Sequence, residues 1–237
     1  MLSVVRGRAA GVRLDGAVDN STSDPATTRP QKGVPRWPAA VVLLVIGALF
    51  LPISDQLTAG PSWLPLVVVA VLLLLVNVAV LRERHDLGRA FALAAVSVMT
   101  VAVVLSTIYL VSELFLGGVT AAGMLQGSGL IWVANILTFA VWYWEVDGGG
   151  PRMRHVDRHE TSDFLFPQLQ VGDGTSIQGW SPNFLDYLFV AWNASLAYSP
   201  TDTLVMSRRV KVLMMIQSLT SLTTIAVLAA RAINTLG

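Results

Sequence analysis

The sequence predicts an all-α protein, a polytopic transmembrane helical bundle with either six spans or five spans plus a re-entrant segment. Hydrophobic residues make up 54% of the chain and charged residues only 13%, whereas soluble domains carry about 25% charged residues. The apolar residues are also gathered in six runs along the chain. Because so little charge cannot cover a surface in water, most of the surface is expected to face lipid.

Residues 1–37 are predicted to form a disordered polar tail, and residues 38–237 a single helical membrane domain. The tail is rich in Gly, Pro, Ser, Thr and Asp and shows no hydrophobic periodicity, which is typical of segments that cannot bury a core. Within the membrane domain, residues 148–181 form a polar loop that is too short to fold by itself. One folded domain is therefore expected.

Apolar runs of about 20 residues cross the hydrocarbon core as helices. Trp63–Leu81 is nearly continuous Leu and Val, and Ala90–Leu116 is long enough to cross with tilt. The Gly-rich stretch Leu116–Gly129 is expected to be a linker. Trp142–Trp144 form an interfacial aromatic belt, after which Asp147 is expected to lie on the aqueous side. The predicted spans are 39–53, 63–81, 90–116, 130–144 and 210–236, with 183–198 as the remaining run.

The distribution of basic residues predicts the orientation. The tail carries six Lys or Arg residues and the loop Arg82–Arg89 carries three, while the stretches 54–62 and 117–129 carry none. Because cytoplasmic loops are enriched in Lys and Arg, the N-terminus is expected in the cytoplasm. The chain is then expected to be a multi-pass protein of the bacterial inner (plasma) membrane, with the loop 148–181 on the cytoplasmic side.

The apolar run Asn183–Tyr198 is short for a full crossing. Its apolar part has about 15 residues, whereas about 20 are needed. If the run crosses, the basic residues Arg208, Arg209 and Lys211 lie outside, against the charge rule. If it re-enters, these residues stay in the cytoplasm. Length and charge both favour a half-membrane excursion, and a full crossing is the alternative.

The polar hinge Ser199–Thr203 and the closing helix Val210–Leu236 supply most of the candidate functional residues. Ser199, Pro200 and Asp202 match the start of a helix, so a capping role competes with contact to a ligand. Polar residues of the closing helix recur every three or four positions and share one face, which would either pack against other helices or line a water-filled path. The pore or substrate candidates are Asn193, Ser195, Tyr198, Ser199, Thr201, Asp202, Gln217, Ser221 and Thr224.

The stretch Phe189–Asp202, which reads FVAWNASLAYSPTD, is followed by a long helix. This order resembles the pore helix, filter and inner helix of potassium channels, and the resemblance implies a conducting pore. The sequence departs from that family at Ala197 and Ser199, where the filter glycines would stand, and at Pro200, which restricts the backbone. The segments WYWEVD, DFLFPQ and SPTDT also resemble a family of uncharacterised bacterial integral-membrane proteins, which implies a polytopic protein without an established activity.

Few other residues suggest chemistry. Glu113 is the carboxylate that lies well inside a predicted span, so it is the candidate for a coupling-ion or proton role. His155 and His159 have the spacing of two metal ligands on a helix but lack a third, and the chain has no cysteine. We therefore expect no metal and no cofactor. No nucleophile is paired with a base, so no enzyme is predicted.

Two functions remain open from the sequence. The first is a channel-like or transporter-like membrane protein, with a path formed by 183–203 and the closing helix and with several copies around a pore. The ion or solute is unknown. The second is a non-conducting structural or assembly protein that uses the closing helix as a partner interface. The expected surroundings are the lipid bilayer, and a net charge of +1 gives no reason to expect nucleic acid.

Overall fold

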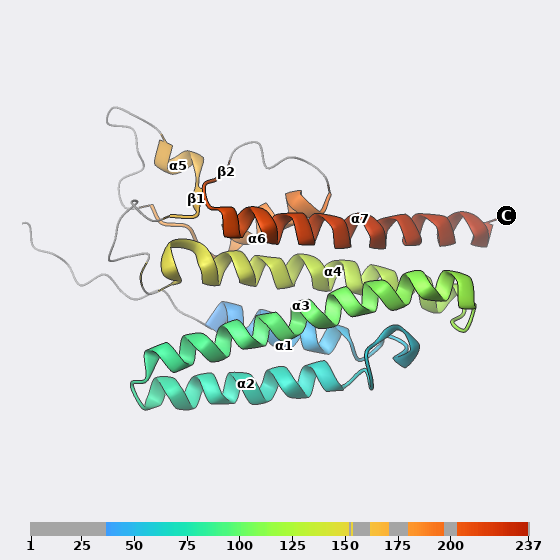
Figure 1. Ribbon diagram of the computed structural model, residues 1–237, viewed down its shortest axis with the longest axis horizontal. Coiled ribbons are helices and arrows are strands. Elements are labelled where there is room, and N and C mark those ends of the chain that lie inside the picture. The colour runs from blue at the N-terminus through green and yellow to red at the C-terminus, as the bar shows by residue number, and fades with distance from the viewer. Residues whose placement is uncertain (1–36, 152, 154–161, 171–179, 197–202, 237) are drawn as a thin grey trace, which may run out of the picture. The chain divides into compact units, whose positions relative to one another are not determined.

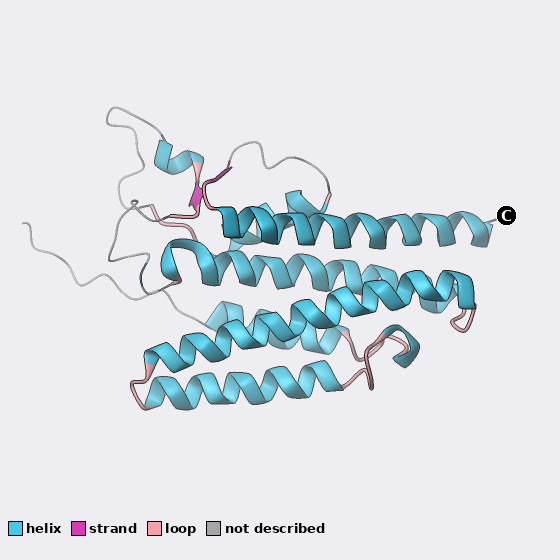
Figure 2. Cartoon of the chain, in the orientation of Figure 1, coloured by secondary structure: helices cyan, strands magenta, loops and turns pink. Residues whose placement is uncertain are grey.

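The computed structural model describes residues 37–151, 153, 162–170, 180–196 and 203–236. These residues are mostly helical and belong to one compact unit (Figures 1 and 2). The main helices are α1 (Trp37–Leu49), α2 (Leu64–Leu81), α3 (His85–Leu116), α4 (Ala121–Val146), α6 (Phe184–Ser195) and α7 (Arg208–Leu236). The short elements are α5 (Pro167–Gln170), the strands β1 (Phe164–Leu165) and β2 (Leu204–Val205), and 3-10 turns at Asp55–Leu57 and Asp147–Gly149.

Four of the described helices are long and apolar enough to cross a membrane: α2, α3, α4 with its following turn, and α7. α1 is apolar but has only 13 residues. α6 has 12 residues, which corresponds to about 18 Å of helix, while the hydrocarbon core is about 30 Å thick. The prediction of an integral membrane helical bundle is confirmed at this level.

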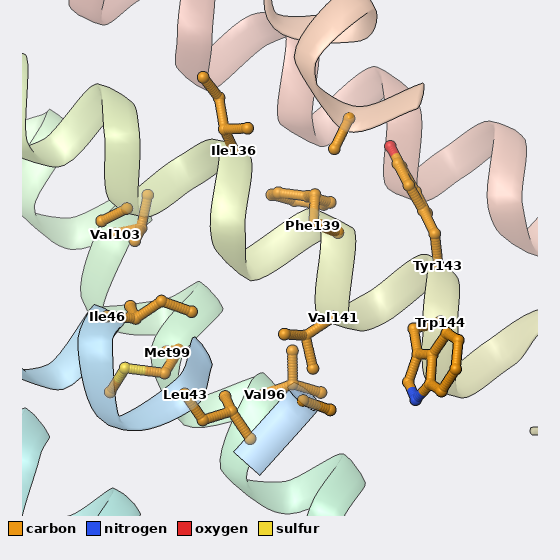
Figure 3. Close-up of a cluster of buried hydrophobic side chains, with 14 of the residues drawn as sticks. Leu43, Ile46, Val96, Met99, Val103, Ile136, Phe139, Val141, Tyr143 and Trp144 are labelled. Carbon is orange, nitrogen blue, oxygen red and sulfur yellow. The ribbon is translucent and has the colours of Figure 1, made fainter. Parts of the chain in front are cut away.

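α4 lies at the centre of the bundle and contacts α1, α3, α6 and α7. In its apolar window 61% of the residues are buried, compared with 17% in α2 and 33% in α3. Leu43 and Ile46 of α1 and Met99 of α3 pack toward α4 in the core (Figure 3). Because most of α4 is enclosed by other helices, its buried polar side chains meet protein and not lipid.

The helix ends gather in two groups. Gln126 near the start of α4 donates to the carbonyl of Pro52 in the α1–α2 loop (3.5 Å), so the α1–α2 and α3–α4 loops share one end, here called the Glu113 end. Arg209 of α7 reaches the carbonyl of Val146 at the end of α4 (3.4 Å). The end of α4, the start of α7, β1 and β2 share the other end, here called the Arg209 end (Figure 1).

The predicted linker Leu116–Gly129 is wrong, because α4 begins at Ala121 and takes up most of it. The side chain of Thr120 accepts a hydrogen bond from the backbone of Gly123 (3.2 Å) and caps the helix. Gly127 lies where α4 meets the 3-10 turn of the α1–α2 loop, and a Cβ atom there would stand 2.6 Å from Cδ1 of Leu57. The glycine therefore lets the side chain of Leu57 pack closely against the backbone of α4.

The described part of the loop 148–181 is packed and partly regular. β1 pairs with β2 in an antiparallel ladder, with Phe164 opposite Val205 and Leu165 opposite Leu204. The side chains of Phe164 and Phe166 are buried. The all-α prediction therefore misses a small sheet, which forms because the buried aromatic residues hold the loop against the start of α7.

Candidate functional site at the buried end of α6

α6 begins with a complete capping box. The side chain of Asn183 accepts from the backbone of Leu185 (2.8 Å), and the side chain of Asp186 accepts from the backbone of Asn183 (2.7 Å). Such reciprocal bonds satisfy N–H groups that have no partner inside the helix. The apolar residues Tyr187 and Val190 then face the core. The capping box fixes where α6 begins, and its short apolar stretch lets the helix end inside the bundle.

The last four carbonyl groups of α6 all have donors. The backbone N–H of Leu196 donates to the carbonyls of Trp192 and Asn193, both at 3.2 Å. Ser218 of α7 donates to the carbonyl of Ala194 (3.2 Å). Ser221 of α7 donates to the carbonyl of Ser195 (2.7 Å). These carbonyls have no partner within a helix, and an unpaired carbonyl in lipid costs several kcal/mol. The polar face of α7 therefore caps the end of α6.

Gln217 joins three helices. Its Nε2 donates to the carbonyl of Ala191 (2.7 Å) and to Oγ of Ser195 (2.8 Å) in α6. Its Oε1 accepts from the hydroxyl of Tyr143 in α4. Its backbone carbonyl accepts from Nδ2 of Asn135 (3.2 Å). The donors and acceptors around the side chain fix the orientation of its amide. Gln217 is fully buried and ties α4, α6 and α7 at one depth.

The polar stripe continues with Ser221 and Thr224, which are also fully buried. Oγ of Ser221 accepts from Nε1 of Trp132 in α4 (2.9 Å). Oγ1 of Thr224 lies 3.3 Å from Oγ1 of Thr107 in α3 and bonds to the carbonyl of Thr220 (2.8 Å). Ser195, Gln217, Ser221 and Thr224, four of the predicted site residues, thus face the bundle interior and bond there to α3, α4 and α6.

The other predicted site residues do not join this network. Asn193 points away from it and donates to the carbonyl of Phe189 in its own helix (3.0 Å). Tyr198, Ser199, Thr201 and Asp202 lie outside the described residues. The outer face of α6 carries an open groove of about 410 Å³, lined by Leu185, Asp186, Leu188, Phe189 and Trp192. Its lining is mostly apolar, as expected for a face that meets lipid.

A second polar cluster holds the start of α6 at the Arg209 end. Asp147 is fully buried, although the sequence predicts it on the aqueous side. Its Oδ1 accepts from the backbone N–H groups of Asp163 (2.7 Å) and Phe164 (3.2 Å), and its Oδ2 accepts from the hydroxyl of Tyr187 (2.6 Å). The folded loop covers the carboxylate, so Asp147 connects the end of α4 with β1 and α6.

Asp163 extends the cluster to α7. Its two carboxylate oxygens accept from Nε (2.9 Å) and Nη2 (2.5 Å) of Arg209. The Asp163 side chain is 2% exposed and that of Arg209 is 56% exposed, so the pair lies at the surface of the bundle end. The ring of Tyr187 meets Trp144, Phe164 and Phe166 with centroids 5.5–5.9 Å apart. Charge pairing and aromatic packing together fix the loop.

Glu113 lies at the opposite end of the bundle from this cluster. Its Oε2 accepts from the backbone N–H groups of Gly118 (2.9 Å) and Val119 (3.2 Å). The carboxylate therefore fastens the turn that leads from α3 to α4. Its predicted coupling-ion role stays a prediction. Among the described residues no group of three or more His, Cys, Asp or Glu could hold a metal ion, and His155 and His159 lie outside those residues.

Comparison with protein-family models, with curated proteins and with solved structures found no match for this chain. The resemblances to potassium channels and to a bacterial membrane-protein family therefore stay predictions. Of the positions that would form the filter, Ser195–Pro200, those from Ala197 onward lie outside the described residues. The sequence reasoning missed the partners of the stripe: it places Tyr143 in an interfacial aromatic belt and assigns no role to Trp132.

Proposed function

We propose that the protein is a five-span integral membrane protein with one half-membrane hairpin, and that it acts as a non-conducting structural or assembly component of the membrane. The spans are α1, α2, α3, α4 and α7. The hairpin consists of α6 and the chain that leads back to β2. The single observation that carries the proposal is that α7 side chains provide the donors for the buried end of α6.

The positions of the two ends of the hairpin support re-entry. The end of α6 bonds to Ser221, which lies 13 residues into α7 from Arg208, or about 20 Å along the helix. β2 pairs with β1 at the Arg209 end, where α6 also starts. A chain that enters and leaves at one end matches the half-membrane excursion that length and charge favour. The N-terminus and the Arg209 end are then cytoplasmic, in a bacterial plasma membrane.

The bonding of the polar stripe supports a non-conducting role. A path for ions or polar solutes requires polar groups that face water. Gln217, Ser221 and Thr224 are fully buried, and their side chains bond to protein atoms of α3, α4 and α6. Polar side chains with such partners hold helices together in lipid. The stripe serves packing within the chain, so a partner protein would bind a different surface.

Flux through reconstituted vesicles tests this role. The purified chain is placed in liposomes and the fluxes of K⁺, Na⁺, Cl⁻ and protons are measured over a range of voltages. We expect the rates of protein-free liposomes. Ser221→Ala provides the matched variant, because it removes one stripe hydroxyl and leaves the outer faces of α6 and α7 intact. A flux above background that changes in Ser221→Ala would show a path along the stripe and refute the proposal.

A further inference from the structure

Two buried polar atoms in the middle part of α4 have no hydrogen-bond partner among the described residues. Asn135 Oδ1 and Thr138 Oγ1 are buried and accept or donate no hydrogen bond within the described residues. Both side chains are fully buried. Nδ2 of Asn135 donates to the carbonyl of Gln217, which fixes the amide so that its oxygen is the unpaired atom. Residues three apart on a helix share a face, so the two side chains leave α4 on the same side, one turn apart.

Thr138 differs from the other buried threonines of the bundle. Thr107 and Thr224 donate to the carbonyl four residues earlier, as do Thr100 and Thr220. That bond is the usual partner of a threonine hydroxyl inside a helix. The hydroxyl of Thr138 does not make it.

The two atoms lie near the middle of the membrane. Asn135 precedes Val146, the last residue of α4, by 11 positions, or about 16 Å of helix, which is about half of the hydrocarbon thickness of about 30 Å. Oγ of Ser106 in α3 is also buried and has no hydrogen-bond partner among the residues that the structure describes. Trp142 of α4 donates to Thr100 of α3 (2.7 Å), which shows that these two residues lie side by side in antiparallel helices. Ser106 follows Thr100 by six residues and Asn135 precedes Trp142 by seven, so Ser106 and Asn135 lie at nearly the same depth.

We propose that Asn135 and Thr138 bind one buried water molecule at the middle of the membrane, on the side of α4 where Asn135 donates to α7. The water donates to Oδ1 of Asn135 and bonds to the hydroxyl of Thr138. Buried waters in proteins typically make about three hydrogen bonds to polar groups that otherwise have no partner. A metal cation requires more oxygen ligands than these two neutral atoms, which is why water is the ligand.

A structure at a resolution that shows ordered water, combined with Thr138→Val, tests this site. We expect density within hydrogen-bond distance of Oδ1 of Asn135 and Oγ1 of Thr138, and its loss in Thr138→Val. If the natural protein shows no water density at this position, the proposal is overturned. Thr138→Val should also lower the folding equilibrium constant about fivefold, because the bound water loses a partner.

If the site holds no water, Thr138→Val should change the stability in the opposite direction, and that result would overturn the proposal. If the hydroxyl of Thr138 has no partner at all, valine removes an unpaired polar atom and leaves stability unchanged or raises it. The matched control is Thr223→Val, whose hydroxyl bonds to the carbonyl of Leu219 on the outer side of α7 (2.8 Å). Melting in sodium, potassium and choline salts separates water from a cation. We expect no difference among these salts, and stabilisation by sodium or potassium would overturn the assignment to water.

Discussion

Replacing Gln217 tests how α6 is held in the bundle. Gln217→Leu keeps a similar side-chain volume and removes three side-chain hydrogen bonds, to Tyr143, Ala191 and Ser195. Hydrogen bonds between helices in membrane proteins contribute about 0.6 kcal/mol on average and about 1.7 kcal/mol at most. Three bonds correspond to about 2 kcal/mol. The unpaired hydroxyl of Tyr143 raises the expected loss to about 3 kcal/mol.

The assay is reversible unfolding in mixed micelles, followed by tryptophan fluorescence. Thr223→Val is the control on the same helix, and it should change the free energy of unfolding by less than about 0.5 kcal/mol. The reasoning is refuted if Gln217→Leu is as stable as the natural protein. That result would mean that the side chain of Gln217 does not hold α6 in the bundle.

A second substitution, Tyr143→Phe, tests whether Tyr143 and Gln217 stabilise the protein through their shared hydrogen bond. Tyr143→Phe alone removes the bond to Gln217 and should cost about 1 kcal/mol. In the Gln217→Leu background the tyrosine hydroxyl has already lost this partner, so Tyr143→Phe should cost nothing or restore stability. Additive losses in the double variant would show that the two side chains act independently.

Three further substitutions test other contacts. Gly127→Ala should cost about 1–3 kcal/mol, because the new methyl group meets Leu57 at 2.6 Å, and Leu57→Ala should recover part of that loss in a thermal melt. Asp147→Ala should cost about 3 kcal/mol, because it leaves the Tyr187 hydroxyl and two backbone N–H groups without their acceptor; limited proteolysis should then cut the loop before β1 faster, and unchanged cleavage would argue against this anchor. Arg209→Lys should cost less than about 1 kcal/mol, because the pair is exposed on the arginine side, so a larger loss would mean that the bidentate geometry matters more than exposure suggests.

The long helices could be predicted because their signal is local. Trp63–Leu81 needs only apolar length to be recognised, and it forms α2 with nearly the same bounds. α4 is harder, since its first turns carry glycines and polar residues. Gly127 suits a helix there only because Leu57, from a distant loop, packs against it. The first and last residues of a helix cannot be predicted from the local sequence pattern when they depend on such distant contacts.

The site could be predicted in outline but not in its partners. The spacing of Gln217, Ser221 and Thr224 places them on one face, and their role in helix packing is one of the two alternatives that the pattern allows. Which atoms they meet depends on the level at which α6 stops beside α7. Asp147 shows the same limit, because a carboxylate after an aromatic belt is expected in water until a loop is known to fold over it.

The most direct test of the account is the sidedness of the two ends of the hairpin. Ser181 and Met206 flank it and are exposed, and the chain has no cysteine of its own, so Ser181→Cys and Met206→Cys each introduce one thiol. A membrane-impermeant maleimide is applied to intact and to inverted vesicles, with Ala59→Cys in the α1–α2 loop as the marker of the opposite side. The account predicts that both hairpin positions react from the cytoplasmic side and Ala59→Cys from the other. Labelling of Ser181→Cys and Met206→Cys from opposite sides would contradict it.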